Sequence, residues 1–305
     1  MVLHFRSPGT IPILTWVPAR RFPIVQGEKV RPIDDFSQYL INSAFGTQEK
    51  VLMLGLDQVV SWTRAWAGSE GTAREISLKD SGGKVYRTWV HPEWGTGGFS
   101  DLVGRVADLK SAYKQLAIHP AHASLSIIAV QKPSGERVDF FKAKSLMFGQ
   151  TAAVYSFLRF SRAISALAGS LLSLVTVEFF DDFTQVEPAA TSESAQFSME
   201  SLLRLLGWKI ADTEAKRKPF SKEFVSLGVQ VNLSKLATGE IVLQQKPGRA
   251  EALKSQVDAL LHDNNFGFKD ALSVRGRIFF CEGQTFGRVA APVIRMLTRW
   301  SNKLQ

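Results

Sequence analysis

Residues 171–183, LLSLVTVEFFDDF, place two carboxylates directly after an apolar run. The stretch 171–180 is apolar at all but three positions, which predicts a buried strand. Asp181 and Asp182 follow it and the chain is apolar again at Phe183, so we expect the aspartates on a hairpin turn held by hydrophobic flanks. An Asp-Asp pair also suits an ordinary polar turn, and a second pair occurs at 34–35. The surrounding pattern therefore makes 181–182 the candidate site.

Asp108 lies near the end of a second predicted buried strand, residues 103–109. If the two strands are neighbours in one sheet, Asp108 and Asp181 come together although they are far apart in the sequence. Like charges held close together are costly unless cations lie between them. Carboxylate oxygens are the ligands that hard divalent cations prefer. We therefore expect a metal site formed by Asp108, Asp181 and Asp182.

Strand-like and helix-like patterns alternate along the rest of the chain. We expect two extended segments within 16–36 joined at Gln26-Gly27, hairpins over 75–89 and 125–142, and strands over 223–232 and 241–243. We expect helices over 51–66, 111–116, 149–167, 192–206 and most of 248–304. This order predicts an α+β fold with appended lobes.

The composition bounds the class of protein. The chain has 305 residues, 45% of them hydrophobic and 21% charged, which is typical of a globular protein. Its formal net charge of +9 favours a polyanionic partner, because clustered cations bind phosphates by releasing counterions. A scattered basic surface is the alternative.

The chain has one cysteine, Cys281, which excludes an internal disulfide or a thiolate zinc site. It has no uninterrupted apolar run of about 18 residues and no signal-peptide pattern at the amino terminus. We therefore expect no membrane partner and an intracellular location, cytoplasmic or nuclear.

Six stretches resemble, in the same order, the motifs of reverse transcriptases (RNA-directed DNA polymerases) of retrotransposons and related retroelements. They are QGEKVRPIDDF (26–36), VADLKSAYKQLAIHP (106–120), LMFGQTAAVYSFLRF (146–160), FFDD (179–182), LGWKI (206–210) and FVSLGVQV (224–231). The joint match covers roughly residues 20–232 and is more specific than any single motif.

The resemblance implies a right-hand polymerase, with an antiparallel palm sheet and packed helices, a β-rich fingers lobe and a helical thumb. The implied domains are a fingers-like lobe with an insertion at 1–100, a palm at 101–222 with a fingers hairpin at about 125–145, primer-grip hairpins at 223–245 and a helical thumb or connection-like region at 246–305. Ribonuclease H, integrase or recombinase domains, if the element has them, would lie outside this chain.

The implied activity is two-metal nucleotidyl transfer, which extends a primer 3′-hydroxyl with dNTPs on an RNA or DNA template. Two Mg²⁺ or Mn²⁺ ions are the implied cofactors, bound by Asp108 and Asp181 with support from Asp182. The implied nucleotide-binding residues are Lys29, Arg31, Leu109 through its carbonyl, Tyr113 beneath the sugar, Phe148, Gly149 and Gln150, and the implied primer grip is Leu227-Gly228.

Local sequence alone leaves other interpretations open. Tyr113 and Phe148 also suit a core, Gly149 also suits a helix cap, and Gly228 also suits a β-bulge. Lys216 or Lys218 is a candidate proton donor to pyrophosphate, although a run such as AKRK at 215–218 is more often a solvated basic run.

The match also has departures and rivals. Met147 replaces a proline and Phe179 replaces a tyrosine that are usual in the family, and the interval between Asp35 and Asp108 is long for it. An RNA-dependent RNA polymerase would share the metals, but its first motif usually admits a 2′-hydroxyl, unlike Tyr113. An inactive nucleic-acid-binding module would keep the basic surface and lose the carboxylates.

Overall fold

The computed structural model describes two compact units. The described residues are 3–5, 16–26, 29–47, 50, 53–67, 75–79, 82–89, 101–132, 134–211, 213, 217–263, 266–284 and 289–303. The first unit comprises Met1–Met53, Asp108–Ser173 and Glu200–Lys216, and the second comprises Leu54–Ala107, Leu174–Met199 and Arg217–Gln305. Helices and several separate sheets occur together, so the predicted α+β class is confirmed, while the predicted domain boundaries stay a prediction.

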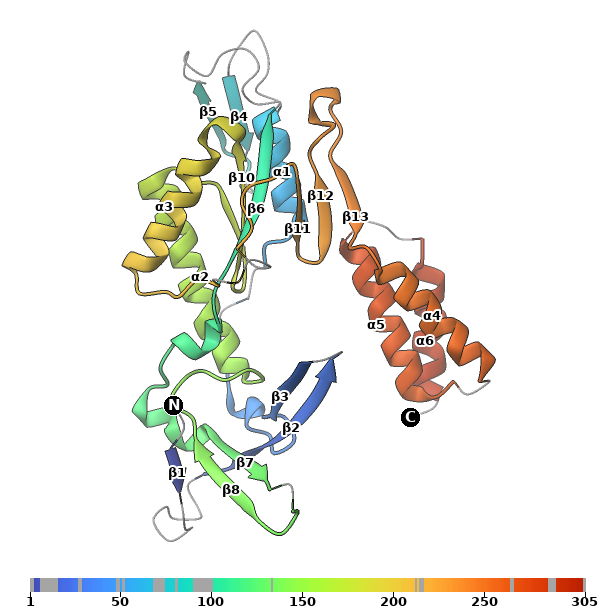
Figure 1. The fold of residues 1–305 in the computed structure, drawn as a ribbon. Helices are drawn as coiled ribbons and strands as arrows, with labels where there is room; N and C mark the ends of the chain where they lie inside the picture. Colours follow the sequence, from blue (N-terminus) through green and yellow to red (C-terminus); the bar gives the residue numbers. More distant parts are fainter. Residues whose placement is uncertain are drawn as a thin grey trace. The chain divides into compact units, whose positions relative to one another are not determined.

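The first unit contains a five-stranded sheet in the order β1-β8-β7-β2-β3 (Figure 1). Its strands are β1 (Leu3–Phe5), β2 (Pro18–Gln26), β3 (Lys29–Asp35), β7 (Ile127–Gln131) and β8 (Val138–Lys142). The predicted hairpin within 16–36 is confirmed, with Gln26 opposite Lys29. The predicted hairpin within 125–142 is confirmed as β7 and β8. A hydrophobic core in the first unit contains Ala19, Phe36, Ile128, Ala143 and Met147.

One long helix and three short 3₁₀ turns complete the first unit. They are α2 (Thr151–Leu172), η3 (Asn42–Ala44), η5 (Ala112–Gln115) and η6 (Pro120–Leu125). The helix expected over 149–167 begins two residues later and runs five residues further. Ser173, with φ +55°, ends it. The strand expected over 171–180 is therefore wrong at its start, because Leu171 and Leu172 complete the helix and the strand β9 spans only Thr176–Phe179.

The second unit contains a three-stranded sheet in the order β6-β10-β9, with β6 at Leu102–Asp108, whose last residue belongs to the first unit, and β10 at Asp182–Pro188. It also contains β4 (Glu75–Lys79) paired with β5 (Val85–Trp89), the helix α1 (Leu56–Ala67), η7 (Ala189–Thr191) and the helix α3 (Ser192–Leu205), which belongs to the first unit from Glu200 onward. The predicted hairpin over 75–89 and the predicted helix over 192–206 are confirmed, and the helix expected over 51–66 begins at Leu56.

A second sheet in this unit corrects the strand expected over 223–232. The segment forms two antiparallel strands, β11 (Glu223–Ser226) and β12 (Val229–Asn232), and β13 (Val242–Gln245) pairs with β12 after the turn η8 (Leu236–Thr238). An unbroken strand was expected because its apolar alternation continues across the turn. Gly228 is a turn residue and not a bulge, since Ser226 pairs directly with Val229.

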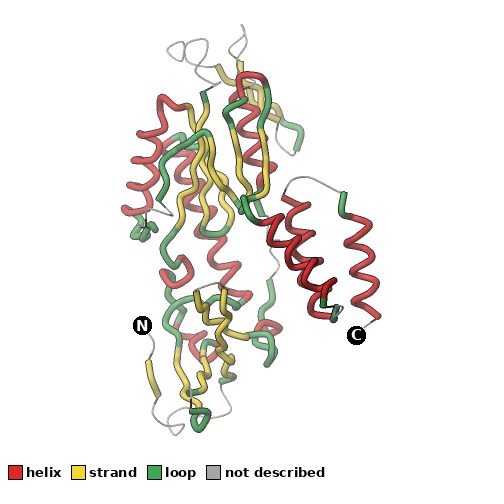
Figure 2. Tube along the Cα trace, turned by 45° about the vertical axis from the view of Figure 1, so that its right-hand side comes forward, coloured by secondary structure: helices red, strands yellow, loops and turns green. Residues whose placement is uncertain are grey.

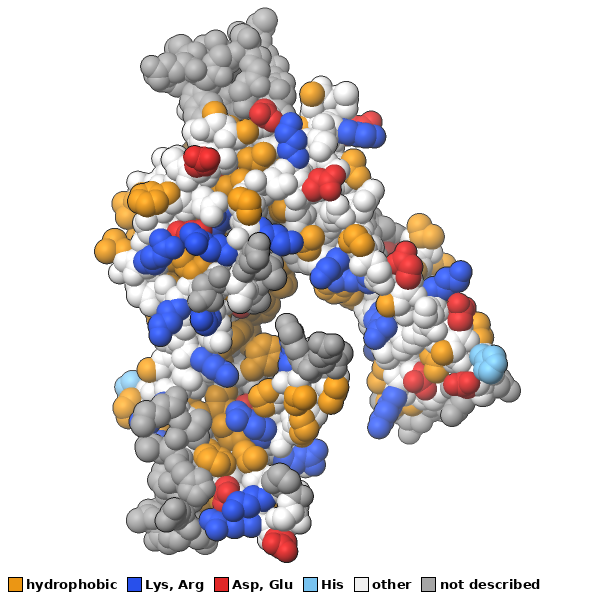
Figure 3. All heavy atoms as spheres, viewed as in Figure 1, with side chains coloured by type: hydrophobic (Ala, Val, Ile, Leu, Met, Phe, Trp, Pro, Cys, Tyr) orange, Lys and Arg blue, Asp and Glu red, His pale blue; other side chains and the backbone are white. Residues whose placement is uncertain are grey.

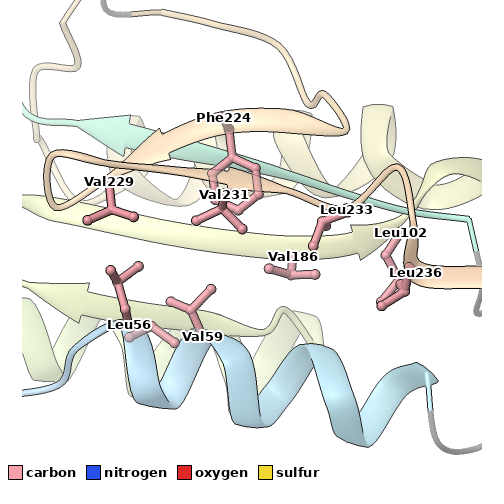
Figure 4. Close-up of a cluster of buried hydrophobic side chains, with 10 residues drawn as sticks. Leu56, Val59, Leu102, Val186, Phe224, Val229, Val231, Leu233 and Leu236 are labelled. Carbon is pink, nitrogen blue, oxygen red and sulfur yellow. The ribbon is translucent and has the colours of Figure 1, made fainter. Parts of the chain in front are cut away.

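The core of the second unit joins α1 to both sheets. Figure 4 shows Leu56 and Val59 of α1 pointing toward Val186 of β10 and toward Val229 and Val231 of β12. Burial of each such side chain stabilises the fold by about 1.5–3 kcal/mol. This packing fixes β10, and with it the end of the strand where Asp182 lies.

The carboxyl-terminal segment forms three helices that lie side by side in Figure 2, α4 (Arg249–His262), α5 (Phe268–Gln284) and α6 (Ala291–Lys303). Ala271, Val274 and Leu297 are buried there, and the rings of Phe266 and Trp300 stack 4.8 Å apart. Among the helices of the described segments, none combines the length and apolar character that crossing a bilayer requires.

Candidate active site

The candidate catalytic aspartates lie at the end of the β6-β10-β9 sheet. The Ala189 N–H, just after β10, donates to the Asp101 carbonyl, just before β6, over 2.8 Å. Neighbouring strands joined in this way are antiparallel. Asp108 is the last residue of β6 and Asp182 is the first of β10, so both residues stand at the same end of the sheet.

Asp181 occupies a two-residue turn between β9 and β10. Phe179 pairs directly with Asp182, which leaves Phe180 and Asp181 as the turn. Phe180 has φ +55°, a conformation that costs a non-glycine residue about 1–2 kcal/mol. Its ring packs edge-on against that of Phe179 with the centroids 5.0 Å apart. The predicted hairpin held by aromatic flanks is confirmed.

The three aspartates have the chemistry for hard divalent cations. Asp108, Asp181 and Asp182 are each partly exposed, and carboxylate oxygens are the ligands that hard divalent cations prefer. Across the described parts of the chain, no three His, Cys, Asp or Glu side chains are already arranged as a metal-binding group. The donor types therefore fit a metal site, while a closed set of three ligands is not assembled.

Further along β10, three of the buried side chains are polar: Thr184, Gln185 and Glu187. The hydroxyls of Thr184 and Ser226 hydrogen-bond across 2.7 Å and join β10 to β11. Glu187 is 5% exposed, and burial raises its pKa to about 7, although the backbone of Val175 and the side chain of Thr191 act to lower it. The two ends of β10 thus hold carboxyls in opposite environments.

In the first unit, Tyr113 lies among aromatic rings. Its ring is 4.8 Å from that of Phe157 and 5.9 Å from that of Phe148, and Phe157 in turn contacts Trp208 at 6.0 Å. Phe157 is fully buried, Tyr113 is half-buried and Phe148 is 67% exposed. Phe148 is therefore not a core residue, which rules out that interpretation of it.

The segment between Asp108 and Tyr113 is held by residues 209–211. The Lys110 N–H donates to the Lys209 carbonyl and the Ala211 N–H donates to the Asp108 carbonyl, each over 2.9 Å. Leu109 is opposite Ile210 between these two bonds, so its carbonyl takes no part in the bridge. That carbonyl remains a candidate metal ligand.

Gln115 also joins these two segments, and sequence reasoning missed it. Its amide nitrogen donates to the carbonyls of Lys110 and Lys209, and its amide oxygen accepts from the Lys209 N–H over 2.7 Å. The partner Lys209 is 94 positions away, and no local pattern signals such a contact.

Gly149 precedes α2 and lies against β3. Its φ is +103°, and a Cβ there would lie 2.5 Å from the carbonyl oxygen of Asp34. The helix begins at Thr151 with Gln150 as the N-cap residue, so the interpretation of Gly149 as the cap is wrong. Gly149 is required because a side chain would collide with the backbone of β3.

Asn42, a second residue that sequence reasoning missed, holds the same corner. Its amide nitrogen donates to the Gly149 carbonyl over 2.9 Å, and its amide oxygen accepts from the Thr151 N–H over 2.9 Å. It satisfies a free N–H of the first helical turn, the role that a local capping residue usually has. Buried Gln150 is anchored nearby, donating to the Leu125 carbonyl and the Ser126 hydroxyl over 3.2 Å each.

The second Asp-Asp pair has a structural role. Buried Asp34 accepts from Arg21 over 2.7 and 3.0 Å, and Asp35 accepts from the N–H groups of Ser37 and Gln38. The pair at 34–35 therefore supports the β2-β3 hairpin and the turn after it.

The predicted phosphate-binding cations belong to β3. Arg31 is exposed on β3, and Lys29 is the first residue of the same strand. The side chain of Lys29 and the whole of Lys216 lie outside the described residues, whereas Lys218 is exposed.

The predicted primer-grip residues form the turn between β11 and β12. Leu227 and Gly228 have φ values of +51° and +73°, as two-residue hairpin turns of type I′ require. Leu227 also packs against the core of the second unit. The Gly228 carbonyl accepts a hydrogen bond from Arg249 over 2.9 Å.

Comparison with known proteins finds similarity to solved structures in fold and no match to a protein-family model or a curated protein. The solved structure of the foamy viral protease-reverse transcriptase dRH with ds DNA matches with a TM-score of 0.55 and 11% identity, covering 100% of this chain and 41% of that one. Structures of the foamy viral protease-reverse transcriptase with dsDNA and with an RNA/DNA hybrid match with TM-scores of 0.52 and 0.53, each at 11% identity, covering 92% and 94% of this chain and 44% and 30% of theirs.

The chain thus spans less than half the length of these solved chains. At this level of identity the similarity concerns architecture alone. This protein has a reverse-transcriptase-like fold.

Proposed function

We propose that the chain is an RNA-directed DNA polymerase of a retroelement, which extends a primer 3′-hydroxyl with dNTPs on a nucleic-acid template. The observation that carries the proposal is the position of Asp108 and Asp181-Asp182 at one end of a single antiparallel sheet, in a chain with a reverse-transcriptase-like fold. Neighbouring residues in the sequence do not account for this arrangement, because β6 and β10 are separated in the chain by the whole of α2.

Asp108, Asp181 and Asp182 are the residues that would hold two Mg²⁺ or Mn²⁺ ions. When bound, such ions lower the pKa of an attacking hydroxyl and neutralise charge on the triphosphate. The partly exposed carboxylates supply the oxygen donors, and the short β9-β10 turn fixes the backbone of two of them. Lys218 stays a candidate for proton transfer to pyrophosphate, because it is exposed.

Tyr113 is the residue that we expect to select the sugar. Its ring is fixed between Phe157 and Phe148, and a ring with two aromatic neighbours cannot easily move aside for an added 2′-hydroxyl. Gly149 and Gln150 shape the same part of the first unit, where a side chain at 149 would obstruct the backbone.

Basic side chains provide the attraction for phosphates. Arg31 is exposed on β3, and the net charge of the chain is +9. Figure 3 shows Lys and Arg side chains among acidic and apolar ones on the visible face of the α4–α6 segment. Contacts of this kind bind a nucleic-acid backbone without selecting its sequence, as copying requires.

Primer extension on an RNA template tests the proposal, with dNTPs and rNTPs in separate reactions. Asp181→Asn should reduce DNA synthesis by on the order of 10³-fold, because transition-state stabilisation of several kcal/mol depends on the metals. The matched control is Asp101→Asn, an exposed carboxylate at the other end of β6 whose ion pair with Lys222 is worth about 0–1 kcal/mol. RNA synthesis instead would favour an RNA polymerase, and tight duplex binding without synthesis would favour a binding module.

Sugar selection gives a second test. Tyr113→Ala should raise the use of rNTPs relative to dNTPs by about tenfold or more, since a steric contact of about 1–3 kcal/mol is lost. Tyr155→Ala, which removes another aromatic contact of the first unit, with Phe45, should leave the ratio unchanged. An unchanged ratio in both variants would remove Tyr113 from the assigned role.

A further inference from the structure

Arg249 connects three elements of the second unit. Its Nη1 donates to the Gly228 carbonyl of the β11-β12 turn over 2.9 Å and to the Gln245 amide oxygen at the end of β13 over 3.1 Å. Its guanidinium lies 4.8 Å from the ring centroid of Phe280 on α5. Gln245 in turn donates to the Cys281 carbonyl over 2.7 Å. One side chain thus joins a hairpin turn, a strand end and a helix.

The turn is built to receive this side chain. A Cβ on Gly228 would lie 2.6 Å from Nη2 of Arg249, so the guanidinium occupies the space that a side chain would need. The φ of Gly228 is positive, as this turn type requires, and its carbonyl accepts the hydrogen bond from Arg249. The close approach and the turn type depend on the same glycine.

Helix formation does not explain an arginine at this position. Arg249 is the first residue of α4, directly after the N-cap Gly248. A cation there opposes the helix dipole, which favours negative charge at this end. Its hydrogen-bond partners among the described residues are a carbonyl and an amide oxygen.

A cavity of about 670 Å³ adjoins the contact, between the start of α4 and α5. Arg249, Lys246 and Arg277 contribute to its lining together with Phe280. Arg277 is exposed and makes none of the contacts that Arg249 makes with the turn. Substitution of Arg277 therefore removes charge alone, whereas substitution of Arg249 removes charge and also the hydrogen bond to the turn.

We propose that Arg249 is a positioning residue, which sets the place of the Leu227-Gly228 turn relative to α4 and α5 and so the place of the primer end that this turn holds. The proposal rests on the proposed polymerase function. A rearrangement of the first turn of α4 would pass to the β11-β12 turn through the hydrogen bond of Arg249 to the Gly228 carbonyl, while the hydrogen bond to Gln245 and the contact with Phe280 hold the guanidinium in place.

The first experiment compares Arg249→Gln with Arg277→Gln in the full chain. Both variants remove one charge from the cavity, so both should weaken primer-template binding by a similar factor of about two to three. Arg249→Gln alone should lower the single-turnover rate of nucleotide addition at saturating dNTP, by about tenfold or more, because a misplaced primer end reacts slowly. Equal rates in the two variants would overturn the proposal.

The second experiment does not depend on catalysis. Hydrogen exchange of the backbone amides at 225–230 in the free protein should accelerate by about fivefold in Arg249→Gln, since a hydrogen bond to the turn is lost. Arg277→Gln should leave these rates unchanged. Unchanged exchange in Arg249→Gln would refute the link. A wild-type chain that extends no primer, with the exchange effect present, would instead refute the polymerase function alone.

Arg249→Lys keeps the test decisive if the glutamine variant fails to fold. Lysine retains the charge but lacks the planar guanidinium, which donates to Gly228 and Gln245 through Nη1 while it lies over the Phe280 ring. It should preserve primer-template affinity and show an intermediate exchange rate and addition rate. Full recovery of the wild-type addition rate by lysine would show that charge alone matters, and would overturn the proposal.

Discussion

Gly149 and Gly228 both have positive φ, and both lie against a neighbour that a methyl group would reach, but the neighbours differ in kind. At Gly149 the neighbour is the carbonyl oxygen of Asp34, part of the backbone of β3. At Gly228 it is the end of the Arg249 side chain. A backbone held in a sheet cannot move aside, whereas a guanidinium can adopt another rotamer. The corner before α2 is therefore rigid, and the β11-β12 turn is adjustable.

The difference suits the roles proposed for the two regions. A nucleotide pocket gains from a fixed shape, because each incoming substrate must meet the same walls. A primer end must move by one position after every addition, so a turn held by one long side chain is better suited to it. Substitutions in these regions test whether the corner at Gly149 is more rigid than the turn at Gly228.

Gly149→Ala should have the largest effect. The unfavourable φ and the contact with the backbone of β3 together should destabilise the protein by about 3–5 kcal/mol. Urea unfolding followed by circular dichroism measures this free energy. A loss below that of Gly228→Ala would mean that β3 shifts easily, and would break the comparison.

Glu187→Gln tests a third position, a buried carboxyl group. We expect the protein around Glu187 not to rearrange when this carboxyl becomes charged. With a pKa of about 7 in the folded protein against 4.5 for an ordinary glutamate, the folded state keeps a proton that the unfolded state has lost. The free energy of unfolding should therefore fall by about 2 kcal/mol between pH 5.5 and 8 through this group. Stability should be restored as pH falls below 7.

The glutamine variant should lack this part of the pH dependence and be more stable than wild type at pH 8. Urea titrations of both proteins at the two pH values give the difference directly. Parallel pH profiles would show that Glu187 is ionised in the folded state throughout this range.

Gly228→Ala should have a smaller effect than Gly149→Ala. The strain of a positive φ contributes about 1–2 kcal/mol, and displacement of Arg249 adds the loss of one hydrogen bond, about 1 kcal/mol. Gly239→Ala is the control, because Gly239 also has positive φ, +80°, with nothing within 4 Å of its Cβ position.

The double variant Gly228→Ala, Arg249→Gln sharpens this result. Once Arg249 is gone, alanine at 228 should cost no more than alanine at 239, so the two single effects should not add. Additive effects would show that Arg249 and the turn are independent.

The sequence predicted what depends on neighbouring residues. Apolar runs, alternation and Gly or Pro signals located β2, β3, β6, β7, β8 and α2, and the aromatic flanks located the turn of Asp181. The end of α2 was missed because Leu171 and Leu172 suit a helix as well as a strand, and the left-handed Ser173 decides between them. Which carboxylates bind metal stays a prediction.

The residues that hold the candidate site were beyond reach of the sequence. Asn42 acts on Gly149 and Thr151 from 107 and 109 positions away, and Gln115 acts on Lys209 from 94. Polar side chains of this kind have no periodic signature, and only the folded chain shows what they reach. Arg249 was missed for a different reason. A basic residue at the start of a helix suggests a side chain exposed to solvent, and not one that hydrogen-bonds to a hairpin turn.

The parallel pairing of β2 with β7 has a consequence for biosynthesis. Pro18–Arg20 lie beside Ile127–Ala129, so the strand next to β2 emerges more than a hundred residues after it. At about 5–20 residues per second, a ribosome needs roughly 5–20 s for that interval. Meanwhile the β2-β3 hairpin has an unpaired edge and carries Val25 and Val30, which are 70% and 64% exposed even in the finished sheet. The nascent chain is thus most open to wrong strand partners and to chaperones before the β7-β8 hairpin is made.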